Sequence, residues 1–277
     1  MYIKCWGSRG SIPISGRDFL KYGGDTTCIE VVAKSGETVI IDAGTGIRNL
    51  GATLDQVHTC HILLTHAHWD HIAGFNFFKP LFNKNKVVEI QNHTFSGLTV
   101  KQIFNTLMSP PFFPITPKDL KATIRFRKDF LKEFSIGSLG IETIELSHPN
   151  GALGFRFTEN GKSFAFLTDN ELGFDHPGNP GFDAYLSFVK DADLLFHDGE
   201  FTPEEYLTRM GWGHSTYGAA LDLAVKAGVK RLGLFHLNQN RTDREVDRIQ
   251  EECRSIIRSE GSKIDCFAVA CGMEFNL

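Results

Sequence analysis

The chain has 277 residues, of which 42% are hydrophobic and 24 are Phe, so it can bury a large core and is not intrinsically disordered. Its 29 basic and 33 acidic residues give a net charge of −4, which argues against a broad nucleic-acid-binding surface. Five of the eleven histidines fall between positions 58 and 71. This density predicts a local function that needs imidazole.

The N-terminal segment and the cysteines favour a cytoplasmic protein. The segment lacks the basic-then-apolar order of a secretory signal, and no apolar run approaches the roughly 18 residues that a membrane span needs. The six cysteines include no CxxC pair, so we expect free and mostly buried thiols. Neither a membrane nor a disulfide framework is expected.

In chain order, the first 95 residues read as short strands. β-Branched and apolar runs predict strands at 2–6, 28–33, 38–42, 61–65 and 87–91. A helix is expected over 97–108, whereas the four prolines of 109–117 exclude a helix there.

The second half begins with strands and then alternates strands with helices. Strands are expected at 141–146, 154–158, 163–167, 193–197, 231–235 and 266–270, and helices from 203, over 216–227 and over 243–259. Two halves that each run from strands to helices predict two sheets packed face to face with helices outside. We therefore expect an α/β fold, a four-layer αββα sandwich, as one domain over residues 1–277.

The strongest chemical signal is the run Thr65-His66-Ala67-His68-Trp69-Asp70-His71. His66 and His68 point the same way if the strand end is extended, and Asp70 and His71 follow where a helix would begin. Three imidazoles and a carboxylate suit zinc, manganese or iron. Partners are expected at other strand ends, where the sequence places His148, Asp169 and His236.

With these residues, the chain resembles the metallo-β-lactamase superfamily over essentially its whole length. The resemblance implies an αββα fold with two divalent metal ions at the edge between the sheets, zinc being expected and manganese or iron the alternatives. It assigns His66, His68 and His148 to one metal, Asp70, His71 and His236 to the other, and Asp169 to both. It also implies that Asp42 supports a ligand histidine.

Two later motifs resemble the phosphodiesterase branch of this superfamily, which includes tRNA 3′-processing nucleases and smaller cyclic-phosphate hydrolases. They are Phe196-His197-Asp198-Gly199-Glu200-Phe201 and Gly213-His214-Ser215-Thr216. The resemblance implies that a metal-bridging hydroxide attacks phosphorus, that His214 is the general acid and that Asp198 orients it, with Asp70 counted among the catalytic residues. His197 is either a buried structural histidine or a support for the site.

The glycine-rich N-terminal segments 7–13 and 23–28 resemble bacterial hydrolases that include 3′,5′-cyclic-nucleotide phosphodiesterases. We therefore expect a dinuclear-metal phosphodiesterase whose partner is a small phosphodiester, most simply a cyclic nucleotide. Three alternatives stay open: a glyoxalase II-like thioesterase, which shares the ligand set, an RNase Z-like tRNA 3′-processing endonuclease, and a non-catalytic binding module. The tRNA nucleases carry a long arm between the residues matching His148 and Asp169, and here only 21 positions separate them.

Substrate contacts are expected from two places. Arg9, in the first glycine-rich turn, is a candidate phosphate contact. The segment 97–132 is a candidate lid that would place Phe112 or Phe113 against a nucleobase, with its basic stretch 118–132 forming either part of this lid or a solvated strand pair. Because relatives in this branch are often homodimers, a homodimer is a candidate assembly.

Overall fold

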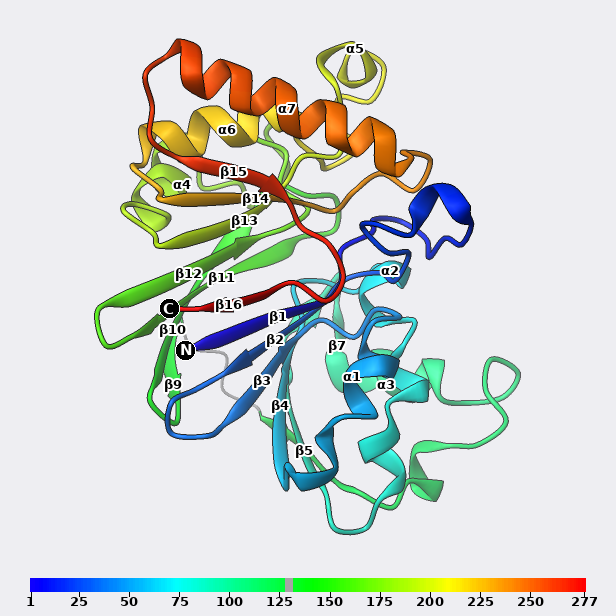
Figure 1. Cartoon of the computed structure of the whole chain (residues 1–277). Helices are drawn as coiled ribbons and strands as arrows, with labels where there is room; N and C mark the ends of the chain where they lie inside the picture. The colour runs from blue at the N-terminus through cyan, green and yellow to red at the C-terminus, as the bar shows by residue number, and fades with distance from the viewer. Residues whose placement is uncertain (128–131) are drawn as a thin grey trace.

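The computed structural model describes residues 1–127 and 132–277. Two seven-stranded sheets face each other, and helices cover their outer faces (Figure 1). The first sheet has the strand order β16 (Glu274–Asn276), β1 (Tyr2–Gly7), β2 (Cys28–Val32), β3 (Thr38–Ile41), β4 (Thr59–Leu63), β5 (Val87–Gln91) and β8 (Thr123–Arg127). The expected αββα sandwich is thereby confirmed.

The second sheet is built from the later part of the chain. Its strand order is β15 (Asp265–Ala268), β14 (Arg231–Phe235), β13 (Leu194–Asp198), β12 (Lys162–Leu167), β11 (Ala152–Glu159), β10 (Leu139–Leu146) and β9 (Glu133–Ile136). In each sheet the central strand, β3 or β12, pairs antiparallel with one neighbour and parallel with the other. A small hairpin, β6 (Thr94–Phe95) with β7 (Leu98–Thr99), stands apart from both sheets.

The helices lie outside the two sheets, as Figure 1 shows for α7 above the second sheet and for α1 and α3 beside the first. They are α1 (Ile47–Gly51), α2 (Trp69–Ile72), α3 (Val100–Leu107), α4 (Phe182–Phe188), α5 (Pro203–Tyr206), α6 (Tyr217–Lys226) and α7 (Asp243–Ser259). Short 3-10 helices occur at Arg17–Phe19, Leu54–Gln56, Phe75–Phe77, Lys79–Phe82 and Pro117–Asp119. Among the described residues, none of the helices combines the length and the apolar character that crossing a bilayer requires.

Helix α7 shows how local sequence and packing agree. Thr242 caps its N-terminus, where it exchanges hydrogen bonds with Glu245. Val246, Ile249 and Cys253 are buried on one face because their spacing follows the helical repeat. The predicted bounds of this helix, including its cap, are confirmed.

The core joins the two sheets, because aliphatic residues of the first, such as Val39, pack in one cluster with aromatic residues of the second, such as Phe157 and Phe164. The cysteines are free, as expected, and all but the partly exposed Cys271 are buried. Buried free thiols pack as small hydrophobic side chains, which agrees with a sequence that shows no disulfide pairing pattern.

Several short elements escaped the sequence analysis, among them β16, α4 and the hairpin of β6 and β7. The solvated strand pair expected within 118–132 is wrong in its pairing. Strand β8 pairs with β5, whereas β9 pairs with β10 of the other sheet. Residues 128–131 of that stretch, among them Lys128, lie outside the described residues.

Candidate metal centre

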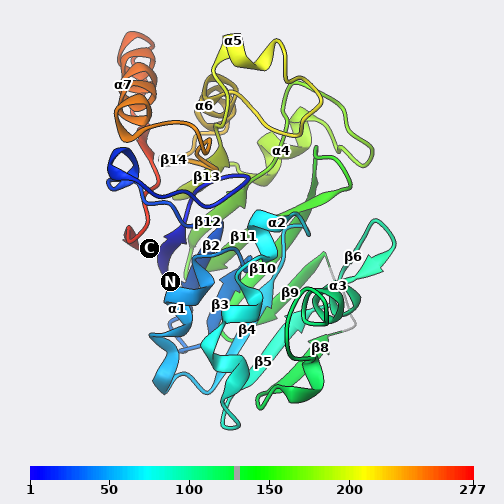
Figure 2. The same cartoon turned by 90° about the vertical axis from the view of Figure 1, so that its right-hand side faces the viewer.

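The ends of several strands deliver the expected site residues to one edge of the sandwich. Figure 2 faces this edge, with α2 near the middle of the view. Parallel strands of one sheet end at a common edge, which is the usual place for a site in an α/β fold. The residues that follow strand ends in this way are Asp42 after β3, His66 after β4, His148 after β10, Asp169 after β12 and His236 after β14.

Three of these residues take a left-handed backbone conformation at the turn out of their strand. The φ angles are 63° at Asp42, 57° at Asp169 and 53° at His236. This conformation is unfavourable for residues other than glycine, and such strain concentrates at functional sites. At the end of each strand, this left-handed conformation turns the side chain away from the direction that it would take in a continued strand.

The seven expected ligands lie in two neighbouring groups. His66, His68, His148 and Asp169 form one, and Asp70, His71 and His236 form the other, with the candidate ligand atoms of each group within 4.8 Å of one another. The carboxylate of Asp169 lies between the groups. Its Oδ2 is 3.6 Å from His66 Nε2 and 3.4 Å from His236 Nε2, and its Oδ1 is 3.4 Å from His71 Nε2. Asp169 is therefore placed to reach two metal ions.

The donor set fits divalent metal ions. Within the described part of the chain, the buried Nε2 atoms of His66 and His71 have no hydrogen-bond partner, and a buried polar atom is costly in that state. Burial lowers the pKa of His66 well below its usual range and that of His148 to about 3, so both imidazoles are neutral. Neutral imidazole is the form that binds metal.

Charges are balanced differently in the second group. Burial alone would lower the pKa of His71 and His236, but Asp70 and Asp169 beside them raise it well above the usual range. Burial would likewise raise the pKa of Asp70 and Asp169, yet the imidazolium groups hold it well below the usual range. Without metal, protons on the two histidines therefore supply the positive charge that the carboxylates require.

Three of the ligand histidines are oriented through their other ring nitrogen. Asp42 Oδ2 accepts a hydrogen bond of 2.8 Å from His71 Nδ1, as the resemblance implied. The carbonyl oxygen of Gly213 accepts one of 2.9 Å from His148 Nδ1, and Glu200 Oε2 accepts one of 2.8 Å from His236 Nδ1. Such partners fix the ring orientation and strengthen metal ligation. The role of Glu200 was missed, because the pairing with His236 spans 36 positions of sequence.

Glycines allow the backbone to approach these rings. A Cβ atom at Gly10 would lie 2.2 Å from His236 Nδ1, and one at Gly213 would lie 2.1 Å from His148 Nδ1. Both positions exclude any side chain. The first glycine-rich turn therefore lies close to the ligand groups, and Ser11 of that turn also donates its N–H to Asp70 Oδ2 at 2.7 Å.

His214 and Asp198 lie beside Asp169, with His214 Nδ1 4.0 Å from Asp169 Oδ2. Asp198 Oδ2 is 3.2 Å from His214 Nδ1 and Glu200 Oε2 is 3.5 Å from it. Burial opposes a charge on His214, but Glu200 and Asp198 raise its pKa to about 9. Its side chain is 11% exposed, so the ring reaches the surface of the site. Helix α6 is capped by Thr216, so His214 is not its cap.

His197 is a structural histidine. It is fully buried, its Nδ1 donates to the carbonyl oxygen of Asp198 and its Nε2 lies 3.2 Å from the side-chain nitrogen of Asn170. Asn170 in turn donates its backbone N–H to Asp198 Oδ2. His197 therefore helps to hold the carboxylate that contacts His214 and has no access to substrate.

A cavity of about 440 Å³ opens beside the first ligand group, within the size range of small-molecule sites. His66 and His68 form one wall, α2 supplies Trp69 and Ile72, and the opposite wall comes from the β6–β7 hairpin and α3. The residues lining it are His66, Ala67, His68, Trp69, Ile72, Phe95, Ser96, Leu98, Ile103, Thr106, Leu107, Asn150 and Gly151. None of these described residues is a lysine or an arginine, so the lining that they form is mostly apolar and uncharged apart from the histidines.

Arg9 does not occupy the place expected for a substrate contact. It is fully buried, and its guanidinium donates to the backbone carbonyl oxygens of Gly23, Asn238 and Arg241. Because these bonds join the N-terminal turns to the segment after His236, the structure makes Arg9 a structural residue. The expectation that it binds phosphate is wrong.

The expected contacts from Phe112 and Phe113 are also not found. Phe112 is 66% exposed, and Phe113 packs edge-on against Phe77 at 5.8 Å between ring centroids. Neither lines the cavity beside the histidines. The parts of the candidate lid that do line the cavity are Leu98 of β7 and Ile103, Thr106 and Leu107 of α3.

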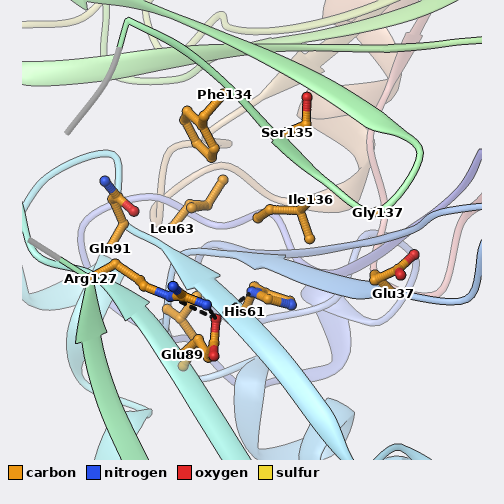
Figure 3. Close-up of a pocket in the computed structure, with 11 residues that line it drawn as sticks. Glu37, His61, Leu63, Glu89, Gln91, Arg127, Phe134, Ser135, Ile136 and Gly137 are labelled. Atoms are coloured by element: carbon orange, nitrogen blue, oxygen red, sulfur yellow. Dashed lines mark hydrogen bonds and ion pairs between the residues drawn. The ribbon is translucent and has the colours of Figure 1, made fainter. Parts of the chain in front are cut away.

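A second cavity, of about 450 Å³, lies between the sheets but away from the metal ligands (Figure 3). Its floor carries Glu89, which is 6% exposed and is bound by Arg127 through two hydrogen bonds of 2.9 and 2.6 Å. His61 lies 3.5 Å from the same carboxylate, and Phe134 and Ile136 of β9 face them. Because none of the seven candidate ligands lines it, this cavity is separate from the site.

Sequence comparisons agree with this site. A family profile described as the β-lactamase superfamily domain matches residues 37–237. A ribonuclease Z from Gemmatimonas aurantiaca is 24% identical, over 84% of this chain and 88% of its own length. A ribonuclease Z from Haloarcula marismortui is 22% identical, over 94% of this chain and 93% of its own.

Solved structures share the fold at low sequence identity. A diphosphatase from the PhnP family has a TM-score of 0.69 at 17% identity, covering 100% of this chain and 97% of its own. The short form of human tRNase Z has a TM-score of 0.63 at 18% identity, covering 100% and 99%. The Zn²⁺-bound PqqB from Methylobacterium extorquens has a TM-score of 0.66 at 14% identity, covering 100% of both chains.

Proposed function

The chain belongs to the metallo-β-lactamase superfamily, in the branch that contains ribonuclease Z, and from this premise we propose that it is a dinuclear-metal phosphodiesterase. A metal-dependent hydrolase is what the family and the two ligand groups establish. The observation that carries the finer proposal is the position of His214, which lies next to the ligand groups and is held by two carboxylates. Zinc is the expected metal, since a structural relative binds Zn²⁺.

The metal ions, when bound, supply positive charge for a phosphate and acidify a water molecule. Asp169 lies between the two ligand groups, so a phosphate held there contacts both halves of the site. Asp70 accepts a hydrogen bond from the Ser11 N–H and lies 3.0 Å from His236 Nε2, which supports its proposed role as a ligand in the second group.

His214 supplies the proton that a poor leaving group needs. In the metal-free chain, Glu200 and Asp198 raise the pKa of His214 to about 9, which favours its protonated form near neutral pH, and the charge of nearby metal ions acts in the opposite direction. With Nδ1 directed at Asp198, its Nε2 is free to donate to an ester oxygen. A thioester leaves as a thiolate and needs no such donor, so this arrangement favours phosphodiester over thioester hydrolysis.

Two kinds of phosphodiester remain candidates. The sequence relatives are ribonucleases Z, which supports an RNA 3′-processing activity more than the cyclic-nucleotide activity expected from sequence. A small ester is favoured by the lining of the 440 Å³ cavity, since a polynucleotide site normally carries cationic side chains along the backbone path. The interval between His148 and Asp169 holds only the β11–β12 hairpin, which also favours a small ester.

The test is a hydrolysis panel on the metal-loaded protein. It contains 3′,5′- and 2′,3′-cyclic nucleotides, a tRNA precursor, a p-nitrophenyl phosphodiester and a glutathione thioester. Cleavage of any phosphodiester, lost on chelation and regained with Zn²⁺, supports the proposal. Cleavage of the thioester alone contradicts it.

A further inference from the structure

The cavity beside His66 and His68 has a composition that selects for one kind of substituent. Trp69 is 64% exposed and Leu98, across the opening, is 51% exposed, although both are large apolar side chains. Phe95 and Ile72 lie buried below them. An exposed indole that faces a cavity with apolar walls is a stacking surface for a planar group.

The cavity and the proton donor border different members of the ligand groups, because His66 and His68 line the cavity whereas His214 lies beside Asp169 and His236. The ring of His148 lies between these places, with its centroid 4.7 and 4.9 Å from those of His66 and His68 and 5.3 Å from that of His214. His214, Asp198 and Glu200 do not line the cavity. A phosphate held at the ligand groups therefore has one ester oxygen toward His214 and the other substituent toward Trp69.

We propose that Trp69, with Leu98 and Ile103 opposite, binds the retained substituent of the phosphodiester, and that this substituent is a single planar, uncharged group such as a nucleobase. The leaving group points toward His214. Among the described residues, those that line the cavity include no lysine or arginine and so offer a second phosphate no counter-charge, which favours a phosphodiester with one phosphate as the substrate class. This inference rests on the proposed phosphodiesterase activity and adds the substrate class to it.

The experiment compares two substrates with the same leaving group, thymidine 5′-(p-nitrophenyl phosphate) and methyl p-nitrophenyl phosphate. They differ only in the retained substituent. The metal-loaded wild-type protein is expected to cleave the thymidine ester with the higher kcat/KM. Trp69→Ala is expected to lower kcat/KM for the thymidine ester by about tenfold, mainly through KM, and to affect the methyl ester far less. Trp69→Phe, which keeps an aromatic ring, is expected to restore most of the preference.

Two further variants complete the design. Leu98→Ala, on the opposite wall, changes the same preference without altering the run from His66 to His71, so it serves if Trp69→Ala binds metal poorly. Phe112→Ala removes an equally exposed aromatic ring that lies outside the cavity, and is expected to keep the wild-type preference. If both esters are cleaved and neither cavity variant changes their ratio, the inference is overturned while the phosphodiesterase proposal stands. If the wild type cleaves neither ester nor any other phosphodiester, the proposed function itself is overturned.

Discussion

His214 Nδ1 lies 3.2 Å from Asp198 Oδ2, although the two residues belong to different elements, a loop before α6 and the end of β13. Asp198 is held in turn by the backbone N–H groups of Asn170 and Ser215. The carboxylate therefore has a fixed direction, and the imidazole that it contacts is fixed with it. This is the arrangement that a proton donor needs.

Replacing His214 separates leaving groups by their need for a proton. His214→Ala is expected to slow cleavage of an alkyl phosphodiester by about 100-fold or more, because an alkoxide must be protonated as it leaves. Cleavage of a p-nitrophenyl ester should fall much less, since nitrophenolate is stable unprotonated. Steady-state rates on both esters, with metal content per chain, provide the measurement. Equal slowing of both, or loss of a metal ion, would show that His214 acts as a ligand, for which its place beside Asp169 and His236 also suits it.

Removing a carboxylate from the second ligand group should empty that group alone. Asp70→Ala is expected to reduce bound metal from two ions to about one per chain and to abolish activity. Elemental analysis of protein after dialysis against limiting Zn²⁺ gives the count. Asp18→Ala, which removes an exposed carboxylate that belongs to neither ligand group, is the matched control. Two retained ions in the Asp70 variant would remove Asp70 from the ligand set.

Metal binding should release protons. In the metal-free chain, carboxylates raise the pKa of His71 and His236 well above the usual range, so both carry protons at pH 7. A metal ion must displace these protons, and raising the pH removes them in advance, so metal affinity is expected to rise with pH. Calorimetry in buffers of different ionisation enthalpy should show release of about two protons per chain on full loading. Release of none would mean that both histidines are already neutral.

The buried guanidinium of Arg9 predicts a loss of stability and not a loss of phosphate binding. Arg9→Ala leaves the carbonyl oxygens of Gly23, Asn238 and Arg241 without their donor, and is expected to lower the free energy of unfolding by about 3 kcal/mol. Urea denaturation measures the change, with the exposed Arg17→Ala as the comparison. A variant of native stability with a raised KM would return Arg9 to the substrate site.

Much of the fold was predictable because short-range sequence patterns determine many of its strands and helices. The strands β5 and β14 and the helix α7 have the predicted bounds, since β-branched runs and a capped 3.6-residue repeat act over a few neighbouring residues. Strand β16 was missed because its three residues carry no such pattern. It exists only through its pairing with β1, from the other end of the chain.

The sequence by itself determined the seven candidate ligands, because metal chemistry restricts them to a few residue types and the strand-end pattern marks their places. Only the tertiary structure decided which other groups surround them. It places Glu200 in contact with His236 and places Trp69 and Leu98 in the lining of one cavity. It also places Arg9, Phe112 and Phe113 outside that cavity. The physical reason is that burial and contact between residues distant in sequence are properties of packing. An arginine in a glycine-rich turn looks the same in sequence whether it faces solvent or three buried carbonyl oxygens.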